Sequence, residues 1–366
     1  MVTRFRFAGG RWGQLLTASL LISSAAGSVA QTQAPKVSGL PQVSAPSSGV
    51  EASGDLAKAR QLIDSGRAEE ALQQLQILGA ARPVPDGIDR VRGLAFYAQA
   101  KLSDADASFA AALQQNPRDQ EAAQMRGLTL FRLGLPAAAI PLLEGAQGWG
   151  SDTKVDPSYV LALCYMDTRR YDDARHAFAT QYGFPGDSAS AYLLAARMLF
   201  RREFLPVAKE FAAKALEKDP QLPRTHALLG EIALAGNHLD EAIAELEKER
   251  VRDPLDGEVY DRLGDAYYRA GQYPEAERSL QRAVLIEPNS TGPYILLGKV
   301  LLQRRDPLGA ATYLERARSM DPANYRTHSL LGQAYRALGR REDANREVQT
   351  AQRLQAASEP KLESVH

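Results

Sequence analysis

The chain has 366 residues, 45% of them hydrophobic and 24% charged, which is typical of a folded protein with a sizeable core. Basic and acidic residues number 44 each, so there is no basic excess to neutralise phosphates, and we expect no nucleic-acid partner. The single cysteine, Cys164, excludes an internal disulfide framework and a cysteine-based zinc site. The five histidines do not fall at metal-ligand spacing, so we expect neither a metal nor a cofactor.

Residues 1–30 have the order of a secretory leader: arginines, then an apolar run, then small residues at Ser28 and Ala30. No acidic residue occurs before Glu51. The apolar run, 15–29, is too short and too rich in serine and threonine to cross a bilayer as a stable helix. We therefore expect cleavage after Ala30 and a periplasmic or secreted protein. A mitochondrial presequence, also arginine-rich and poor in acids, is the alternative.

Residues 31–51 carry three prolines among serine, glycine and glutamine, a composition that predicts a flexible linker. No cysteine follows the apolar run, which excludes a lipid anchor on an N-terminal cysteine. After cleavage we expect no integral membrane segment.

From residue 52 onward the sequence repeats. Gly230, Gly264, Gly298 and Gly332 each close a similar pentapeptide and are spaced 34 residues apart. One frame covers the chain to residue 358, with one residue of slippage between the third and fourth units. Units one to three occupy 52–154 and units four to nine occupy 155–358, followed by a tail at 359–366. The nine units begin at 52, 86, 120, 155, 189, 223, 257, 291 and 325.

Two columns of the repeat contain only small residues. Position 20 is alanine in all nine units, and position 8 is always glycine or alanine. Such columns are expected where the two helices of a hairpin touch, because a larger side chain there would cost about 1–3 kcal/mol. The alanines of position 20 are Ala71, Ala105, Ala139, Ala174, Ala208, Ala242, Ala276, Ala310 and Ala344.

Two further columns mark helix ends. Position 32 is proline in six of the nine units, which predicts the end of a second helix, because proline lacks the N–H and clashes inside a helix. Position 15 is glycine in four units, as the exit of a first helix favours. Each unit is therefore predicted to be a helix-turn-helix, and the fold to be all-α.

With aromatic residues at positions 11 and 17, these columns resemble the tetratricopeptide-repeat family over residues 52–358. The resemblance implies a right-handed α-solenoid of about nine helix-turn-helix units, in which the first helices line a concave groove that binds a protein or peptide. Unit one departs from the pattern at Ala59 and Leu62, and unit two at Arg92. The aromatic columns contain Tyr165, Tyr171, Tyr267, Tyr273 and Tyr335.

The repeats leave no stretch for a catalytic domain, and no phosphate loop, nucleophile elbow or zinc-protease motif occurs in the sequence. His226 and His328 both occupy position 4, three units apart, so they cannot share a metal. Cys164 is interpreted as a small buried hydrophobe. We expect no enzyme activity.

The family geometry directs positions 2, 5, 9, 12 and 13 of each first helix into the groove. In units two to five these positions form an apolar, aromatic strip with two cations, the composition that interface centres favour. The alternative is that these side chains only pack between units. The candidate partner-binding residues are Leu94, Tyr97, Leu128, Phe131, Tyr159, Leu163, Met166, Leu193, Arg197, Phe200 and Arg201.

In unit seven the same positions give an acidic cluster of Glu258, Asp261 and Asp265, and Arg269 follows Asp265 by four residues. The lysine and asparagine of the family's chaperone-tail clamp are replaced in unit one by Leu56 and Arg60. We therefore expect a non-catalytic scaffold that binds a protein or peptide in the cell envelope, where association with envelope complexes fits by family analogy. An organellar or cytosolic adaptor, or an enzyme with an unrecognised site, are the alternatives.

Overall fold

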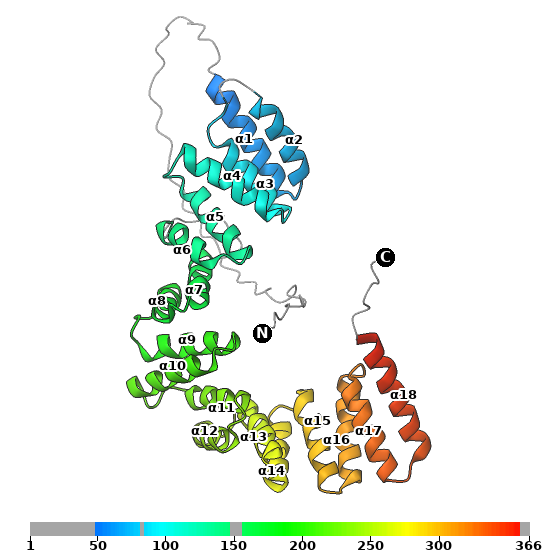
Figure 1. Cartoon of the computed structure of the whole chain (residues 1–366). Coiled ribbons are helices and arrows are strands. Elements are labelled where there is room, and N and C mark those ends of the chain that lie inside the picture. The colour runs from blue at the N-terminus through cyan, green and yellow to red at the C-terminus, as the bar shows by residue number, and fades with distance from the viewer. Residues whose placement is uncertain (1–47, 81–83, 147–155, 359–366) are drawn as a thin grey trace, which may run out of the picture. The chain divides into compact units, whose positions relative to one another are not determined.

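The computed structural model describes residues 48–80, 84–146 and 156–358, and these residues form helices and turns without any β-strand. The predicted leader, most of the predicted linker and the C-terminal tail lie outside the described residues. Eighteen helices follow one another there as nine pairs, one pair for each predicted unit (Figure 1). The all-α solenoid expected from the repeat is confirmed.

The first helices are α1 (Ser48–Asp64), α3 (Ile88–Ala98), α5 (Gln120–Arg132), α7 (Pro157–Asp167), α9 (Ala189–Arg201), α11 (Thr225–Ala235), α13 (Gly257–Arg269), α15 (Thr291–Gln303) and α17 (Tyr325–Ala337). The second helices are α2 (Ala68–Gly79), α4 (Leu102–Gln115), α6 (Pro136–Gly145), α8 (Tyr171–Tyr182), α10 (Leu205–Lys218), α12 (Leu239–Arg252), α14 (Tyr273–Ile286), α16 (Pro307–Met320) and α18 (Arg341–Ser358). Helix α1 begins four residues before the predicted start of the first unit at 52. The last proline of the predicted linker is Pro46, so no proline interrupts the helix from Ser48 onward.

Polar caps and prolines set the helix ends. Several first helices start at an Asp, Ser or Asn whose side chain accepts a hydrogen bond from a backbone N–H of the first turn. The capping residues of this kind are Asp119, Asp156, Ser188, Asp256 and Asn324. Helices α10, α12, α14 and α16 each end two residues before a proline of position 32, as predicted.

Each helix packs against the next along the chain, and most consecutive first helices also touch one another, as α3 touches α5 and α5 touches α7. Consecutive second helices of the described chain make no comparable contact. The first helices therefore form the more closely spaced row, as expected of helices that line the concave side of a solenoid. Because α6 packs against α7, units one to three and units four to nine belong to one compact unit.

The small columns mark the place where the two helices of a pair meet. All nine alanines of position 20 are buried, and so are all nine residues of position 8. A Cβ built on Gly230 would lie 2.5 Å from the Leu246 side chain and 3.3 Å from the carbonyl oxygen of Ala242. The glycine thus makes room for the large side chain at position 24 as well as for the backbone at position 20. The contact with position 24 could not be predicted from the two columns of small residues.

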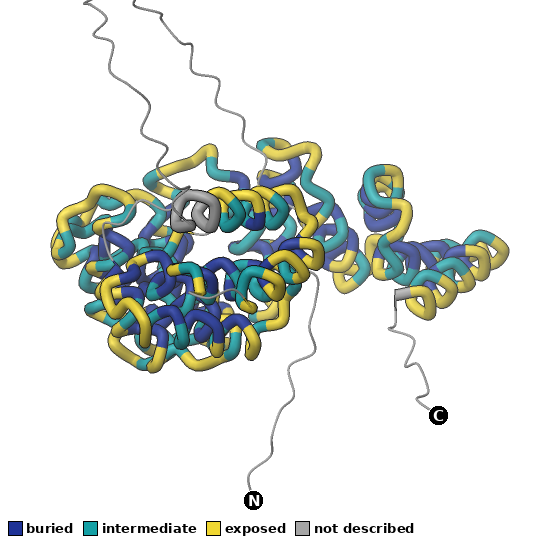
Figure 2. The backbone as a smooth tube through the Cα atoms, turned by 90° about the horizontal axis from the view of Figure 1, so that it is seen from above, coloured by how far each residue is buried: buried dark blue, intermediate teal, exposed yellow. Residues whose placement is uncertain are grey.

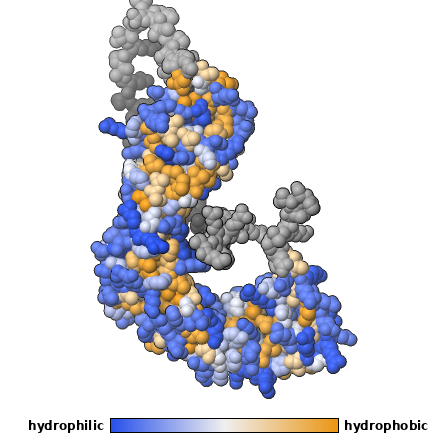
Figure 3. All heavy atoms as spheres, in the orientation of Figure 1, coloured by the Kyte–Doolittle hydropathy of each residue, from blue (hydrophilic) through white to orange (hydrophobic). Residues whose placement is uncertain are grey.

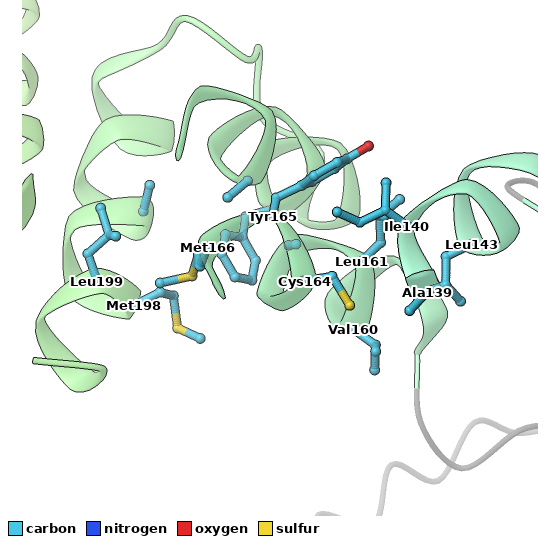
Figure 4. Packing of buried hydrophobic residues seen from close by; sticks show 14 of the residues in the cluster. Ala139, Ile140, Leu143, Val160, Leu161, Cys164, Tyr165, Met166, Met198 and Leu199 are labelled. Atoms are coloured by element: carbon cyan, nitrogen blue, oxygen red, sulfur yellow. The ribbon is translucent and has the colours of Figure 1, made fainter. Parts of the chain in front are cut away.

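Apolar packing continues through the stack in several clusters. The largest extends from Ala105 to Ile232 and so joins α4 to α11. In Figure 4, Leu161 of α7 lies toward the side chains of α6, and Met166 lies toward Met198 and Leu199 of α9. Figure 2 shows buried positions recurring along the helices, with exposed positions on their outer sides and at turns. Cys164 is fully buried, as expected, and burial raises the pKa of its thiol to about 12.

Position 15 has a positive φ in every unit. Four of the nine residues are the glycines that the sequence singled out, and the other five are larger residues in the same left-handed conformation. These five are Ala100, Arg169, Glu203, Asn237 and Arg305. The short turn between the helices therefore demands this conformation whichever residue occupies it.

We expect Gly271→Ala to lower the free energy of unfolding by about 1 kcal/mol. Gly271 has a φ of +76°, and a Cβ there would meet no atom within 4 Å, so backbone strain alone is tested. The reverse change, Glu203→Gly, should raise stability by a similar amount because φ at Glu203 is 63°. Urea unfolding followed by circular dichroism measures both, and an unchanged Gly271→Ala midpoint would contradict the argument.

We expect Ala276→Leu to lower the free energy of unfolding by about 1–3 kcal/mol, because a fully buried position between two helices has no room for the added atoms. The control is Ala213→Leu, which adds the same atoms at an exposed position of α10. Thermal melts of the two variants decide the point: equal melting temperatures would mean that the alanine column is not a packing constraint.

Candidate functional site

The eleven predicted partner-binding residues lie on the first helices α3, α5, α7 and α9, and we call them the first-helix strip. Nine of them are apolar or aromatic, and all nine belong to, or pack against, the single cluster that joins α4 to α11. Seven of these nine keep part of their surface exposed: Leu94, Tyr97, Phe131, Tyr159, Leu163, Leu193 and Phe200. Arg197 is half-buried and Arg201 is exposed. In Figure 3 hydrophobic residues gather on the face shown, over the helices between α3 and α10.

Leu128 and Met166 are placed in the core instead of at the surface, with exposed fractions of 3% and 1%. Leu163 at the same repeat position as Leu128, and Phe131 at the same position as Met166, keep part of their surface exposed. Equivalent positions thus differ in exposure, because the side chains of the adjacent unit decide what is covered. For these two residues the alternative of packing between units describes the structure.

Rings hold part of the strip in place. The Tyr159 ring lies 5.7 Å from the Phe178 ring of α8, centroid to centroid, so its orientation is set by its own helix pair. The Arg132 guanidinium lies 4.7 Å from the centroid of the Tyr97 ring, which brings together units two and three. Arg132 occupies position 13 and was not among the predicted site residues, although the same column had indicated Arg201.

Most acidic side chains of the unit-seven cluster form ion pairs with arginines. Glu258 pairs with Arg224 at 2.6 Å, and Asp265 pairs with Arg269 at 3.6 Å, as its i,i+4 spacing indicated. Asp261 is less well compensated: burial raises the pKa of its carboxyl, the nearby charge of Arg262 lowers it, and those of Asp265 and Glu258 raise it further.

Glu231 of α11 belongs to the same acidic surface. Burial raises the pKa of its carboxyl, and the negative charge of Glu258 acts in the same direction, while Arg262 opposes both. Glu231 occupies position 9 of unit six. The groove positions that identified the acidic residues of unit seven would therefore have identified Glu231 as well.

The aromatic column at position 11 joins adjacent units. Tyr165, Tyr267 and Tyr335 each donate a hydrogen bond to a glutamate at position 25 of the preceding unit, at 2.6, 2.9 and 2.6 Å. Burial, followed by the hydrogen bond to the glutamate, raises the pKa of Tyr267 and of Tyr335 to about 12. Because these phenols stay protonated as donors, the column has a structural role in the stack.

Each histidine at position 4 contacts a glutamate of its own unit. The Nδ1 atom of His226 lies 2.6 Å from Glu245, and that of His328 lies 2.5 Å from Glu347. Within the described residues there is no group of three or more histidine, cysteine or acidic side chains that could hold a metal ion. In the same part of the chain, none of the helices has the length and apolar character needed to cross a membrane.

Two surface cavities lie outside the strip. One of about 280 Å³ lies between α12, α13 and α14 and is lined by Glu247, Tyr260 and Tyr267 among others. The other, of about 340 Å³, is lined by Asp86, Arg90 and Asp119 among others. Both have charged linings, and none of the eleven strip residues contributes to either.

Models of the tetratricopeptide repeat match residues 90–152, 159–223, 257–290 and 301–363. The chain is 27% identical over 183 residues to the Tetratricopeptide repeat domain-containing protein PYG7, chloroplastic, of Arabidopsis thaliana. That alignment covers 49% of this chain and 56% of the relative, so the chain spans little more than half of the relative's length.

Solved structures of similar fold include MamA and YrrB, the latter described as a TPR protein with an unusual peptide-binding site. MamA is 25% identical, with a TM-score of 0.45 over 49% of this chain and 99% of its own. YrrB is 23% identical, with a TM-score of 0.45 over 50% of this chain and 95% of its own. Repeat columns, nine helix pairs and matching family models agree: the chain belongs to the tetratricopeptide-repeat family.

Proposed function

We propose that this protein is a non-catalytic scaffold that holds a peptide or protein segment in a groove along its first helices. One observation carries the proposal. Seven apolar or aromatic side chains from four consecutive first helices pack against one shared core cluster and remain partly exposed to solvent. Partly exposed aromatic groups that are already held by a core are the usual anchors of protein interfaces.

The helical framework supports such binding energetically. Tyr159 is oriented by its contact with Phe178, and the strip residues sit on helices that are packed before any partner arrives. A partner therefore meets ordered side chains, and less conformational entropy is lost on binding. An extended or helical segment with apolar residues on one face would fit, since both recognition modes use regularly spaced anchors.

We expect Phe131→Ala combined with Phe200→Ala to weaken partner capture at least tenfold, because each ring removes apolar contact area near the centre of the strip. The measurement is quantitative crosslinking and pull-down from the source cells with wild-type and variant proteins side by side. Circular dichroism should show unchanged helicity.

The matched control for this experiment is Phe184→Ala, which removes an exposed ring outside the strip. A partner that is retained by the double variant, or lost equally with Phe184→Ala, would move the binding site elsewhere on the molecule.

We propose further that the scaffold works in the periplasm or outside the cell, in association with envelope complexes. The support is the order of residues 1–30, with arginines before an apolar run and small residues at its end. An organellar or cytosolic adaptor remains the rival.

N-terminal sequencing of the protein recovered from its source cells tests the location. We expect the mature chain to begin at Gln31, because Ala30 ends the predicted cleavage motif. Fractionation of the same cells should place the protein in the periplasm or the medium. An uncleaved chain in the cytosol would exclude export and favour the adaptor.

A further inference from the structure

The first-helix strip carries a surplus of positive charge. Among the described residues no carboxylate lies within 4.0 Å of Arg132, Arg197 or Arg201. Arg132 and Arg201 are exposed, and Arg197 is half-buried. The Arg132 guanidinium lies over the ring of Tyr97, so its positive charge is next to an aromatic residue of the strip.

Three acidic side chains lie on the first helices α3, α5, α7 and α9, and all have cationic partners; Asp89 of α3 pairs with Arg92. Glu121, near the start of α5, pairs with Arg60 at 2.5 Å and with Arg90 at 3.1 Å. Asp167, at the end of α7, pairs with Arg202. These carboxylates compensate other arginines, so the three strip arginines remain available to a partner.

The next first helices, α11 and α13, carry a cluster of carboxylates that Arg224, Arg262 and Arg269 neutralise in large part but not completely. Glu231 of α11 and Asp261 of α13 both have carboxyl pKa values raised by burial, with like charges contributing. Arg197 lies close enough to lower the pKa of Glu231, although the two do not form an ion pair. Further carboxylates gain less there because the arginines of α11 and α13 already have acidic partners, so an acidic partner is favoured on α3 to α9.

Resting on the proposed function, we propose that the first-helix strip recognises a segment in which leucine or phenylalanine side chains alternate with aspartate or glutamate. The apolar side chains would contact residues such as Phe131 and Phe200, and the carboxylates would pair with Arg132, Arg197 and Arg201. Arginine suits this role because its planar guanidinium forms paired hydrogen bonds with a carboxylate and also stacks on aromatic rings.

The test uses the mature full-length chain and synthetic peptides that share one pattern of Leu and Phe and differ only in whether the intervening residues are Glu, Lys or Gln. Fluorescence polarisation measures each affinity at low and at raised salt concentration. We expect the Glu peptide to bind about tenfold more tightly than the Gln peptide, with the difference shrinking as salt rises. The Lys peptide should bind more weakly than both.

Arg197→Glu combined with Arg201→Glu should abolish the preference for the Glu peptide. The matched control is Arg282→Glu combined with Arg316→Glu, which changes net charge equally at exposed arginines on the second helices α14 and α16. We expect this control to keep at least half of the preference, and thermal melts check that both variants are folded.

The outcomes separate this inference from the proposed function. If all three peptides bind equally, or the Lys peptide binds best, and Phe131→Ala with Phe200→Ala weakens them, the strip binds peptides but the acidic preference is wrong. No measurable binding of the Glu peptide also overturns the preference, while the pull-down with the phenylalanine variant still decides whether the strip holds a partner. Loss of the preference in the control variant would show a general effect of net charge.

Discussion

The close approach of the two helices within each unit is the constraint on which the rest of the structure depends. Alanine at position 20 and glycine or alanine at position 8 let the backbones come together, and in most units a large residue at position 24 fills the remaining space, although unit five has Ala212 there. Leu246 occupies this place over Gly230, and Leu280 does so over Gly264. Because the small columns recur in all nine units, successive first helices lie in one row, and a continuous surface can form across units even though equivalent positions differ in exposure.

Much of the fold could be predicted because its determinants are local and repeated. The alanine column, the prolines of position 32 and the spacing of the units predicted the helix pairs, and the structure confirms them. The left-handed turn at Glu203 could not be predicted, because nothing about glutamate demands it; the short link between two packed helices does. Burial of Leu128 and Met166 depends on how the adjacent units pack, which a repeat position does not encode.

The first-helix strip combines apolar contact area with positive charge, and the two have different roles. Its apolar and aromatic side chains supply contact area on an ordered framework, and its arginines, which form no ion pair among the described residues, supply charge at the edge of that area. Rows of arginine alone would attract any anion, and apolar side chains alone would accept many segments. In the proposed recognition the two together select by both shape and charge, and the carboxylates of α11 and α13 mark the limit of the strip.

The hydrogen bond from Tyr165 to Glu144 lies at the junction where the repeat gains its one extra residue. Together with the packing of α6 on α7, it holds the fourth unit against the third by side-chain contacts instead of by the length of the connection. The contact between the third and fourth units therefore depends on which side chains of α6 and α7 meet, and a repeat can gain a residue at such a junction while its stack continues.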